Sequence, residues 1–121
     1  MIFPFDNPLF LLPIITGPIL IIVGYIMLRW PPKNINALYG YRTKSSMKSQ
    51  ERWGFAQQFS AKEMIKVGFY YVLTSVLAFF QPSETTGTLI SLGIMIALMA
   101  FLIYNVETAI KNKFKNNNQN L

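Results

Sequence analysis

Three long apolar segments, separated by one polar segment and one short turn, dominate the chain. They cover about residues 9–29, 64–80 and 88–105, and no charged residue lies in the central part of any of them. A helix rises about 1.5 Å per residue, so roughly 20 apolar residues cross the hydrocarbon core of a bilayer. The pattern therefore predicts three membrane-spanning helices, the second of them near the lower limit of length.

The first apolar segment is predicted to be a retained span and not a cleaved signal peptide. No Lys or Arg precedes it and no small-residue cleavage pattern follows it. Pro13 and Pro18 lie inside it, so we expect a kink or a broken upper half. Gly17 and Gly24 lie seven residues apart on one face, where they would permit close contact with another helix. A homodimer could form through this face.

Residues 30–63 form the polar segment, which we divide into a loop and a helix. Pro31 and Pro32 end the first span, and a loop rich in Asn and Tyr follows. Residues 46–61 lack proline and predict a helix, capped by Ser45 or Ser46. Its large apolar side chains gather on one side, which favours an interfacial helix at the membrane surface. Arg52 shares that side, so burial against other helices is the alternative.

Beyond the third span the helix is expected to continue for about two turns. Glu107 and Lys111 are four residues apart in the order that stabilises a helix by ion pairing. Residues 111–121 form a polar tail. The fold class that follows is all-α: one integral membrane domain over residues 1–121, a three-helix bundle with one interfacial helix.

Composition strengthens the membrane assignment. Of 121 residues, 52% are hydrophobic and 13% are charged, whereas roughly 25% are charged in an average soluble domain. A soluble fold of this size could not bury so much apolar surface, so the lipid bilayer is the expected partner. The net charge of +6 does not indicate nucleic-acid binding, because the basic residues flank the spans and belong to no recognisable binding module.

The distribution of charge predicts the orientation. The segment between the first two spans, with its flanks, holds eight basic residues: Arg29, Lys33, Arg42, Lys44, Lys48, Arg52, Lys62 and Lys66. The remaining three lie in the C-terminal tail, and the opposite side has only Asp6 and Glu84. By the positive-inside rule the N-terminus is outside, and the polar segment and the C-terminus are cytoplasmic.

The residue inventory argues against catalysis and cofactors. Histidine and cysteine are absent, which removes the commonest general base and the commonest metal ligands. Glu51 and Glu63 are twelve residues apart, about 18 Å along a straight helix, so they cannot act as a pair. We expect no enzyme, no metal and no cofactor. Glu63 is expected either to pair locally with a lysine or to bridge to Arg42.

The polar segment carries a motif that resembles a known family. It reads Asn36-Ala37-Leu38-Tyr39-Gly40-Tyr41-Arg42-Thr43, followed by Ser46-Met47 and by Trp53 with Ala56. The Gly-Tyr-Arg-Thr core, a downstream Ser-hydrophobic pair and a Trp resemble the SdpI/YfhL family of small bacterial membrane proteins. The resemblance runs from about residue 9 to residue 80, in a short three-span form. Gln57 stands where the family often has Asn.

The resemblance implies a role in immunity, at the cytoplasmic membrane of a bacterium. Members protect the cell against a secreted, membrane-active toxin peptide. In the best-known case the protein also signals by holding a cytosolic repressor at the membrane. The toxin peptide and the repressor are therefore the partners that the resemblance suggests.

The motif residues also have a direct physical interpretation. Gly40 permits a tight turn, Tyr39 and Tyr41 suit the interface, and Trp53 is a packing partner for the loop. The guanidinium of Arg42 could bind a carboxylate, a phospholipid phosphate or helix-end carbonyls, or could clamp the loop to a helix.

Three functions are weighed on this basis. The first is toxin immunity. The second is a small oligomeric protein that binds or transports a lipid or small molecule, which requires a continuous polar cavity between the spans. The third, an enzyme acting on lipid, is disfavoured by the missing His and Cys.

Overall fold

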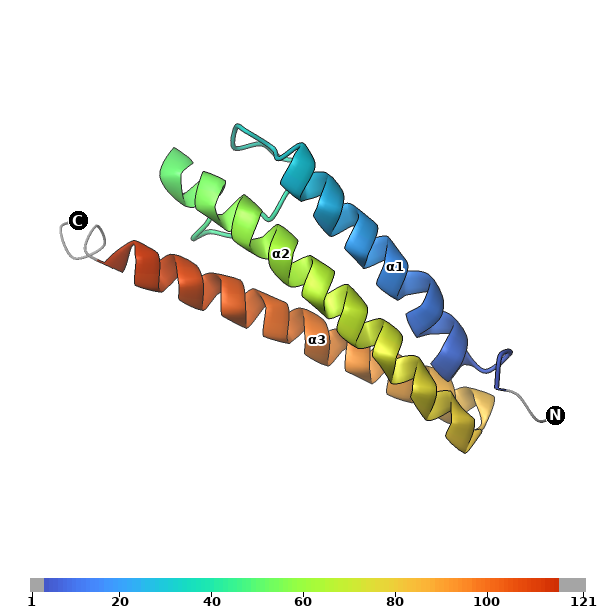
Figure 1. Ribbon diagram of the computed structural model, residues 1–121. Helices are drawn as coiled ribbons and strands as arrows, with labels where there is room; N and C mark the ends of the chain where they lie inside the picture. Colours follow the sequence, from blue (N-terminus) through green and yellow to red (C-terminus); the bar gives the residue numbers. More distant parts are fainter. Residues whose placement is uncertain (1–3, 116–121) are drawn as a thin grey trace.

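The computed structural model describes residues 4–115, which form a bundle of long helices (Figure 1). The elements are α1 (Pro8–Arg29), α2 (Gln50–Thr74), a short 3₁₀ helix η1 (Ser75–Phe80) and α3 (Glu84–Lys113). Within residues 4–115 there is no strand. Three helical stretches, Pro8–Arg29, Gln50–Phe80 and Glu84–Lys113, are long and apolar enough to cross a membrane. The predicted all-α membrane bundle is confirmed.

Each long helix begins at a short polar residue that accepts a hydrogen bond from the first turn. Asn7, Ser49 and Ser83 occupy these positions before α1, α2 and α3, which satisfies backbone donors that have no partner within the helix. The predicted cap at Ser45 or Ser46 is wrong by one turn, because Ser46 is engaged inside the preceding loop.

The separate interfacial helix predicted over residues 46–61 is not formed; residues 50–61 are instead the first part of α2, and residues 46–49 belong to the loop. The helix runs without a break from Gln50 to Thr74. One side of this segment is buried, including Trp53 and Ala56 at 0% exposure. The apolar residues on this side pack against α3: Ala56 of α2 and Ile110 of α3 belong to one hydrophobic core cluster. Burial against neighbouring helices, the alternative interpretation, is therefore the one that holds.

α1 and α2 are in backbone contact along a seam of glycines. A Cβ added to Gly17 would lie 2.8 Å from the carbonyl oxygen of Gly68, and a Cβ on Gly68 would lie 2.7 Å from that of Gly17. A Cβ on Gly24 would lie 2.8 Å from the carbonyl oxygen of Ala61. The glycine face of α1 is thus covered by α2 of the same chain. It is not available for a homodimer, and any homodimer, which stays a prediction, needs another surface.

α1 is one continuous helix through Pro13 and Pro18, so the predicted break does not occur. Each proline removes only one backbone hydrogen bond, and a broken backbone in hydrocarbon would leave further polar groups without partners. The continuous helix is therefore the less costly arrangement.

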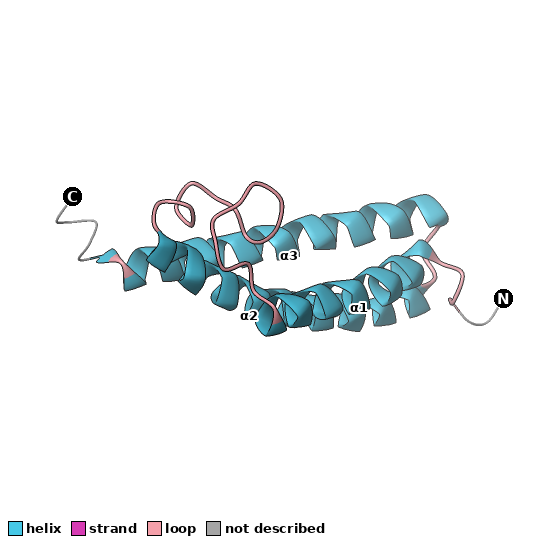
Figure 2. Ribbon diagram, turned by 90° about the horizontal axis from the view of Figure 1, so that it is seen from above, coloured by secondary structure: helices cyan, strands magenta, loops and turns pink. Residues whose placement is uncertain are grey.

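The bundle is closed at one end and spread at the other. At its start, α1 is tied to the turn that precedes α3, because the side-chain amide of its capping residue Asn7 donates to the Pro82 carbonyl oxygen at 2.8 Å. From there α1 and α3 diverge on either side of α2 (Figures 1 and 2). The start of α1 and the end of α3 lie at opposite ends of the bundle (Figure 1). Which end faces the cytoplasm stays a prediction, and the tail beyond residue 115 lies outside the described residues.

Candidate functional site

The loop of residues 30–49 packs at the spread end of the bundle, where α1 ends and α2 begins (Figure 2). In this loop Gly40 has a φ of 112°, a conformation that L side chains rarely adopt. A Cβ at Gly40 would lie 2.5 Å from the Gln57 side-chain oxygen and 2.8 Å from Cγ of Pro32. Glycine is therefore required here both by its backbone angle and by space.

Gln57 holds the loop against α2 through two hydrogen bonds to one residue. Its side-chain oxygen accepts from the Tyr41 N–H at 2.7 Å, and its side-chain nitrogen donates to the Tyr41 carbonyl oxygen at 2.8 Å. The side chain is 1% exposed. A buried amide with both its oxygen and its nitrogen paired fixes the register of the loop on the helix.

Glu107 of α3 holds the same loop from the other side. Its Oε2 accepts a hydrogen bond from the Tyr41 hydroxyl at 2.7 Å and another from the Thr43 hydroxyl at 3.0 Å. Burial of the phenol, its hydrogen bond to Glu107 and the negative charge of Glu107 all raise the pKa of Tyr41. Tyr41 is therefore a neutral hydrogen-bond donor at physiological pH.

Glu107 was predicted to pair with Lys111, and that prediction is wrong. Within residues 4–115 the structure has one ion pair, between Glu63 and Lys66 at 3.7 Å. Glu107 turns toward the loop because two hydroxyls there reach its carboxylate. No local pattern marks this residue, since its partners are more than 60 positions away in the sequence.

Ser46 closes the turn that follows the motif. Its hydroxyl accepts from the Thr43 N–H at 2.9 Å, and its own N–H donates to the Thr43 hydroxyl at 3.2 Å. The side chain is fully buried. Met47 donates its N–H to the Thr43 carbonyl oxygen at 3.0 Å, but its side chain is exposed. Ser46 is thus a structural residue of the loop.

The entry of the loop is held by three further motif residues. The Asn36 side-chain oxygen accepts from the N–H groups of Leu38 and Tyr39 at 2.9 and 2.7 Å. The Tyr39 hydroxyl donates to the Trp30 carbonyl oxygen at 2.9 Å. Trp53, which is 0% exposed, donates its indole N–H to the Pro32 carbonyl oxygen at 2.6 Å. Trp53 therefore packs against the start of the loop.

Arg42 differs from all these residues, because its side chain is exposed. Among residues 4–115 it has no hydrogen-bond or ion-pair partner, so it does not clamp the loop to a helix. Of the two partners expected for Glu63, the structure has the local lysine, because Glu63 pairs with Lys66 on its own helix, and the bridge to Arg42 is not formed. Arg42 is the charged residue of the motif, and its guanidinium is available for a ligand.

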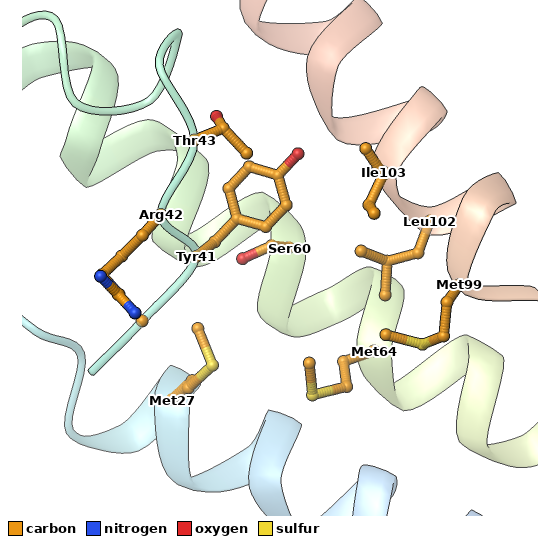
Figure 3. A pocket seen from close by; sticks show the side chains of 10 residues that line it. Met27, Tyr41, Arg42, Thr43, Ser60, Met64, Met99, Leu102 and Ile103 are labelled. Carbon is orange, nitrogen blue, oxygen red and sulfur yellow. The ribbon is translucent and has the colours of Figure 1, made fainter. Parts of the chain in front are cut away.

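A cleft of about 270 Å³ opens beside the motif. Gly40 to Thr43 line one end of it, and the other walls come from all three long helices. Figure 3 shows Met27 of α1, Met64 of α2 and Met99 of α3 converging on this space, with Tyr41 and Thr43 at the loop side. Methionine side chains are flexible and polarisable, so such a lining adapts to apolar ligands of different shape.

The structure thus divides the predicted site residues. It brings Gly40, Tyr41, Arg42 and Thr43 to the cleft, held in place by Gln57 and Ser46. The others lie outside the cleft: Asn36, Tyr39, Met47, Trp53, Ala56 and Glu63. Within residues 4–115 no group of three or more acidic residues is placed to hold a metal ion.

Comparison with known proteins matches residues 33–105 to a family model described as the SdpI/YfhL protein family. The matched region contains the whole motif, α2 and most of α3. A curated relative, the uncharacterized protein YfhL of Bacillus subtilis (strain 168), is 44% identical over 55 residues, which are 46% of this chain and 50% of that protein. The chain therefore matches about half the length of this relative. No solved structure matches the chain.

Proposed function

The chain belongs to the SdpI/YfhL protein family, and from this premise we propose that it is a bacterial immunity protein. It is a multi-pass membrane protein with three helices suited to span the bilayer. The proposal is that it protects the cell that makes it against a secreted, membrane-active peptide. Sequestration of a cytosolic repressor, which the family resemblance also suggests, stays a prediction.

The observation that carries the proposal is the combination of Arg42 and the methionine-lined cleft. Most residues of the motif form hydrogen bonds that hold the loop in place, but Arg42 has no hydrogen-bond or ion-pair partner within residues 4–115. It stands at an apolar space between three helices. A membrane-active peptide offers complementary groups, namely apolar side chains for the cleft and a carboxylate for the guanidinium.

The location of the cleft suggests how such a peptide would reach it. Arg42 is predicted to lie on the cytoplasmic side, whereas a secreted toxin arrives from outside. Because α1 and α3 diverge toward the loop (Figures 1 and 2), a peptide already inserted in the bilayer would approach between them. Immunity would then consist of capturing inserted toxin at the inner leaflet.

The alternative function, transport of a lipid or small molecule, required a continuous polar cavity between the spans. The cleft instead lies at one end of the bundle, and half of the residues that line it are Met, Leu or Ile. This favours capture of an apolar ligand over passage of a polar one.

The test is a killing assay in a toxin-sensitive bacterium that expresses the chain. Cells are challenged with membrane-active peptides secreted by related bacteria, and the inhibitory concentration is measured. We expect Arg42→Ala to remove most of the protection and Met99→Trp, which fills the cleft, to do the same. Lys44→Ala is the matched control, since this basic loop residue does not line the cleft. Equal protection by Arg42→Ala and wild type, at equal membrane levels, would contradict the proposal.

A further inference from the structure

A second cavity, of about 310 Å³, lies at the same end of the bundle and is basic in character. We call it the basic pocket; its lining residues are Ser45, Lys48, Arg52, Glu107 and Lys111. It adjoins the methionine cleft through one hydrogen-bond network: Tyr41 and Thr43 line the cleft, and Glu107, to which they donate, lines the basic pocket.

Charge in the basic pocket is unbalanced. Besides Arg52, two lysines face one carboxylate, and within residues 4–115 neither Lys48 nor Lys111 has a carboxylate within 4.0 Å. The carboxylate of Glu107 already accepts two hydrogen bonds from the loop, which stabilise its negative charge. A net positive potential therefore remains, and an anion would reduce it.

Arg52 is held in a fixed position within this pocket. Its guanidinium donates to the Ser45 carbonyl oxygen at 3.4 Å and lies 5.3 Å from the centre of the Phe114 ring. The side chain is 6% exposed. A buried, stacked guanidinium loses less conformational freedom on binding an oxyanion than a free surface lysine would.

The hydroxyl of Ser45 is the second, independent sign of a ligand. Among the described residues it is the one buried side-chain oxygen or nitrogen atom without a hydrogen-bond partner. Buried polar atoms are almost always paired, and leaving one unpaired costs more than an ordinary hydrogen bond contributes. An oxyanion in the basic pocket would accept this hydrogen bond.

The pocket also lies beside the N-terminal end of α2. Lys48 comes directly before the capping residue Ser49, and Arg52 is in the first turn. The positive end of the helix dipole and the N–H groups of that turn favour a negative charge at this position.

From these features we infer that the basic pocket binds a phosphate group. A phosphate carries up to two negative charges and several acceptor oxygens, which suits two lysines and one hydroxyl donor better than a single carboxylate does. Its source is either a phospholipid headgroup or a soluble phosphate compound. Along α3, Glu107 of the basic pocket lies four residues, or about 6 Å, beyond Ile103 of the apolar cleft. A polar site this close to an apolar one suits a lipid headgroup.

The test uses the full chain, purified in a neutral detergent or placed in lipid nanodiscs. One arm titrates inorganic phosphate against chloride at equal ionic strength and follows the melting temperature and ³¹P line width. The other compares nanodiscs of phosphatidylglycerol with nanodiscs of phosphatidylcholine and measures lipid retained on the protein by native mass spectrometry. The variants are Lys48→Gln with Lys111→Gln, and Ser45→Ala; the control is Lys33→Gln with Lys44→Gln, which removes two loop charges outside the pocket.

We expect the Lys48/Lys111 double variant to weaken phosphate or phosphatidylglycerol binding about tenfold or more, as loss of charge-assisted hydrogen bonds does, while the control pair changes it little. Ser45→Ala is expected to weaken binding without lowering the melting temperature of the free protein, because its hydroxyl has no partner to lose. Binding in the first arm alone assigns a soluble phosphate, and retention in the second alone assigns a lipid headgroup. Binding in neither arm, or equal loss in the control pair, would overturn the inference.

Discussion

Replacement of Glu107 tests the least expected contact in the structure. Glu107→Ala removes the acceptor of two hydrogen bonds, from Tyr41 at 2.7 Å and from Thr43 at 3.0 Å. Hydrogen bonds to a charged group contribute roughly 1.5–3 kcal/mol each when buried. All three residues are only partly buried, so solvent screening puts the sum for the two bonds at or below the lower end of that range, about 2–3 kcal/mol of unfolding free energy.

The assay is a double-mutant cycle with Tyr41→Phe, followed by unfolding in detergent micelles. We expect Glu107→Ala and Tyr41→Phe to be coupled by about 1 kcal/mol or more, because removing either partner abolishes the same bond. Lys111→Ala is the matched control. The helix pattern makes Lys111 the partner of Glu107, whereas the structure has no ion pair between them. Coupling of Glu107 to Lys111 and not to Tyr41 would refute the reasoning.

Three further outcomes follow from the geometry. Gly17→Leu is expected to separate α1 from α2 and to destabilise the bundle by several kcal/mol in thermal unfolding, since even a Cβ at Gly17 would lie 2.8 Å from backbone. Gly93→Leu is the control and is expected to be tolerated, because Gly93 has open space around it. Gly40→Ala is expected to cost roughly 2–4 kcal/mol through a strained φ and displacement of the Gln57 amide, a loss measurable as lower melting temperature. The raised pKa of Tyr41 means that its contribution to stability is complete below its usual pKa of 10.0 and is lost as the pH rises beyond it. In a phenolate absorbance titration, Tyr41→Phe should remove an ionisation step that lies above pH 10.0.

The membrane bundle could be predicted from sequence because it follows from one strong local signal. Three uninterrupted apolar stretches of spanning length leave few alternatives, and α1, α2 with η1, and α3 lie where they indicate. The glycine pair on α1 was correctly expected to permit close helix contact. The sequence does not identify the helix that makes this contact, because spacing within one helix does not distinguish a neighbouring span from a second copy of the chain.

The candidate site was predictable only in part, for a similar reason. The motif marked Gly40 to Thr43, and its amphipathic continuation marked a buried face around Trp53. Local pattern does not show whether that face meets lipid or protein, and it therefore favours an interfacial helix where the structure has the buried start of α2. Glu107 was missed because its role depends on the approach of the loop to α3, which is a tertiary event with no local signature.

One comparison tests the central claim, that the motif holds a loop in place so that Arg42 can bind a ligand. Melting temperature and protection against toxin are measured together for Gln57→Ala and Arg42→Ala. We expect Gln57→Ala to lower both, because it leaves the Tyr41 backbone without its two partners. Arg42→Ala is expected to retain the melting temperature and lose protection. An Arg42→Ala protein that melts early, or one that is stable and still fully protective, would contradict the account.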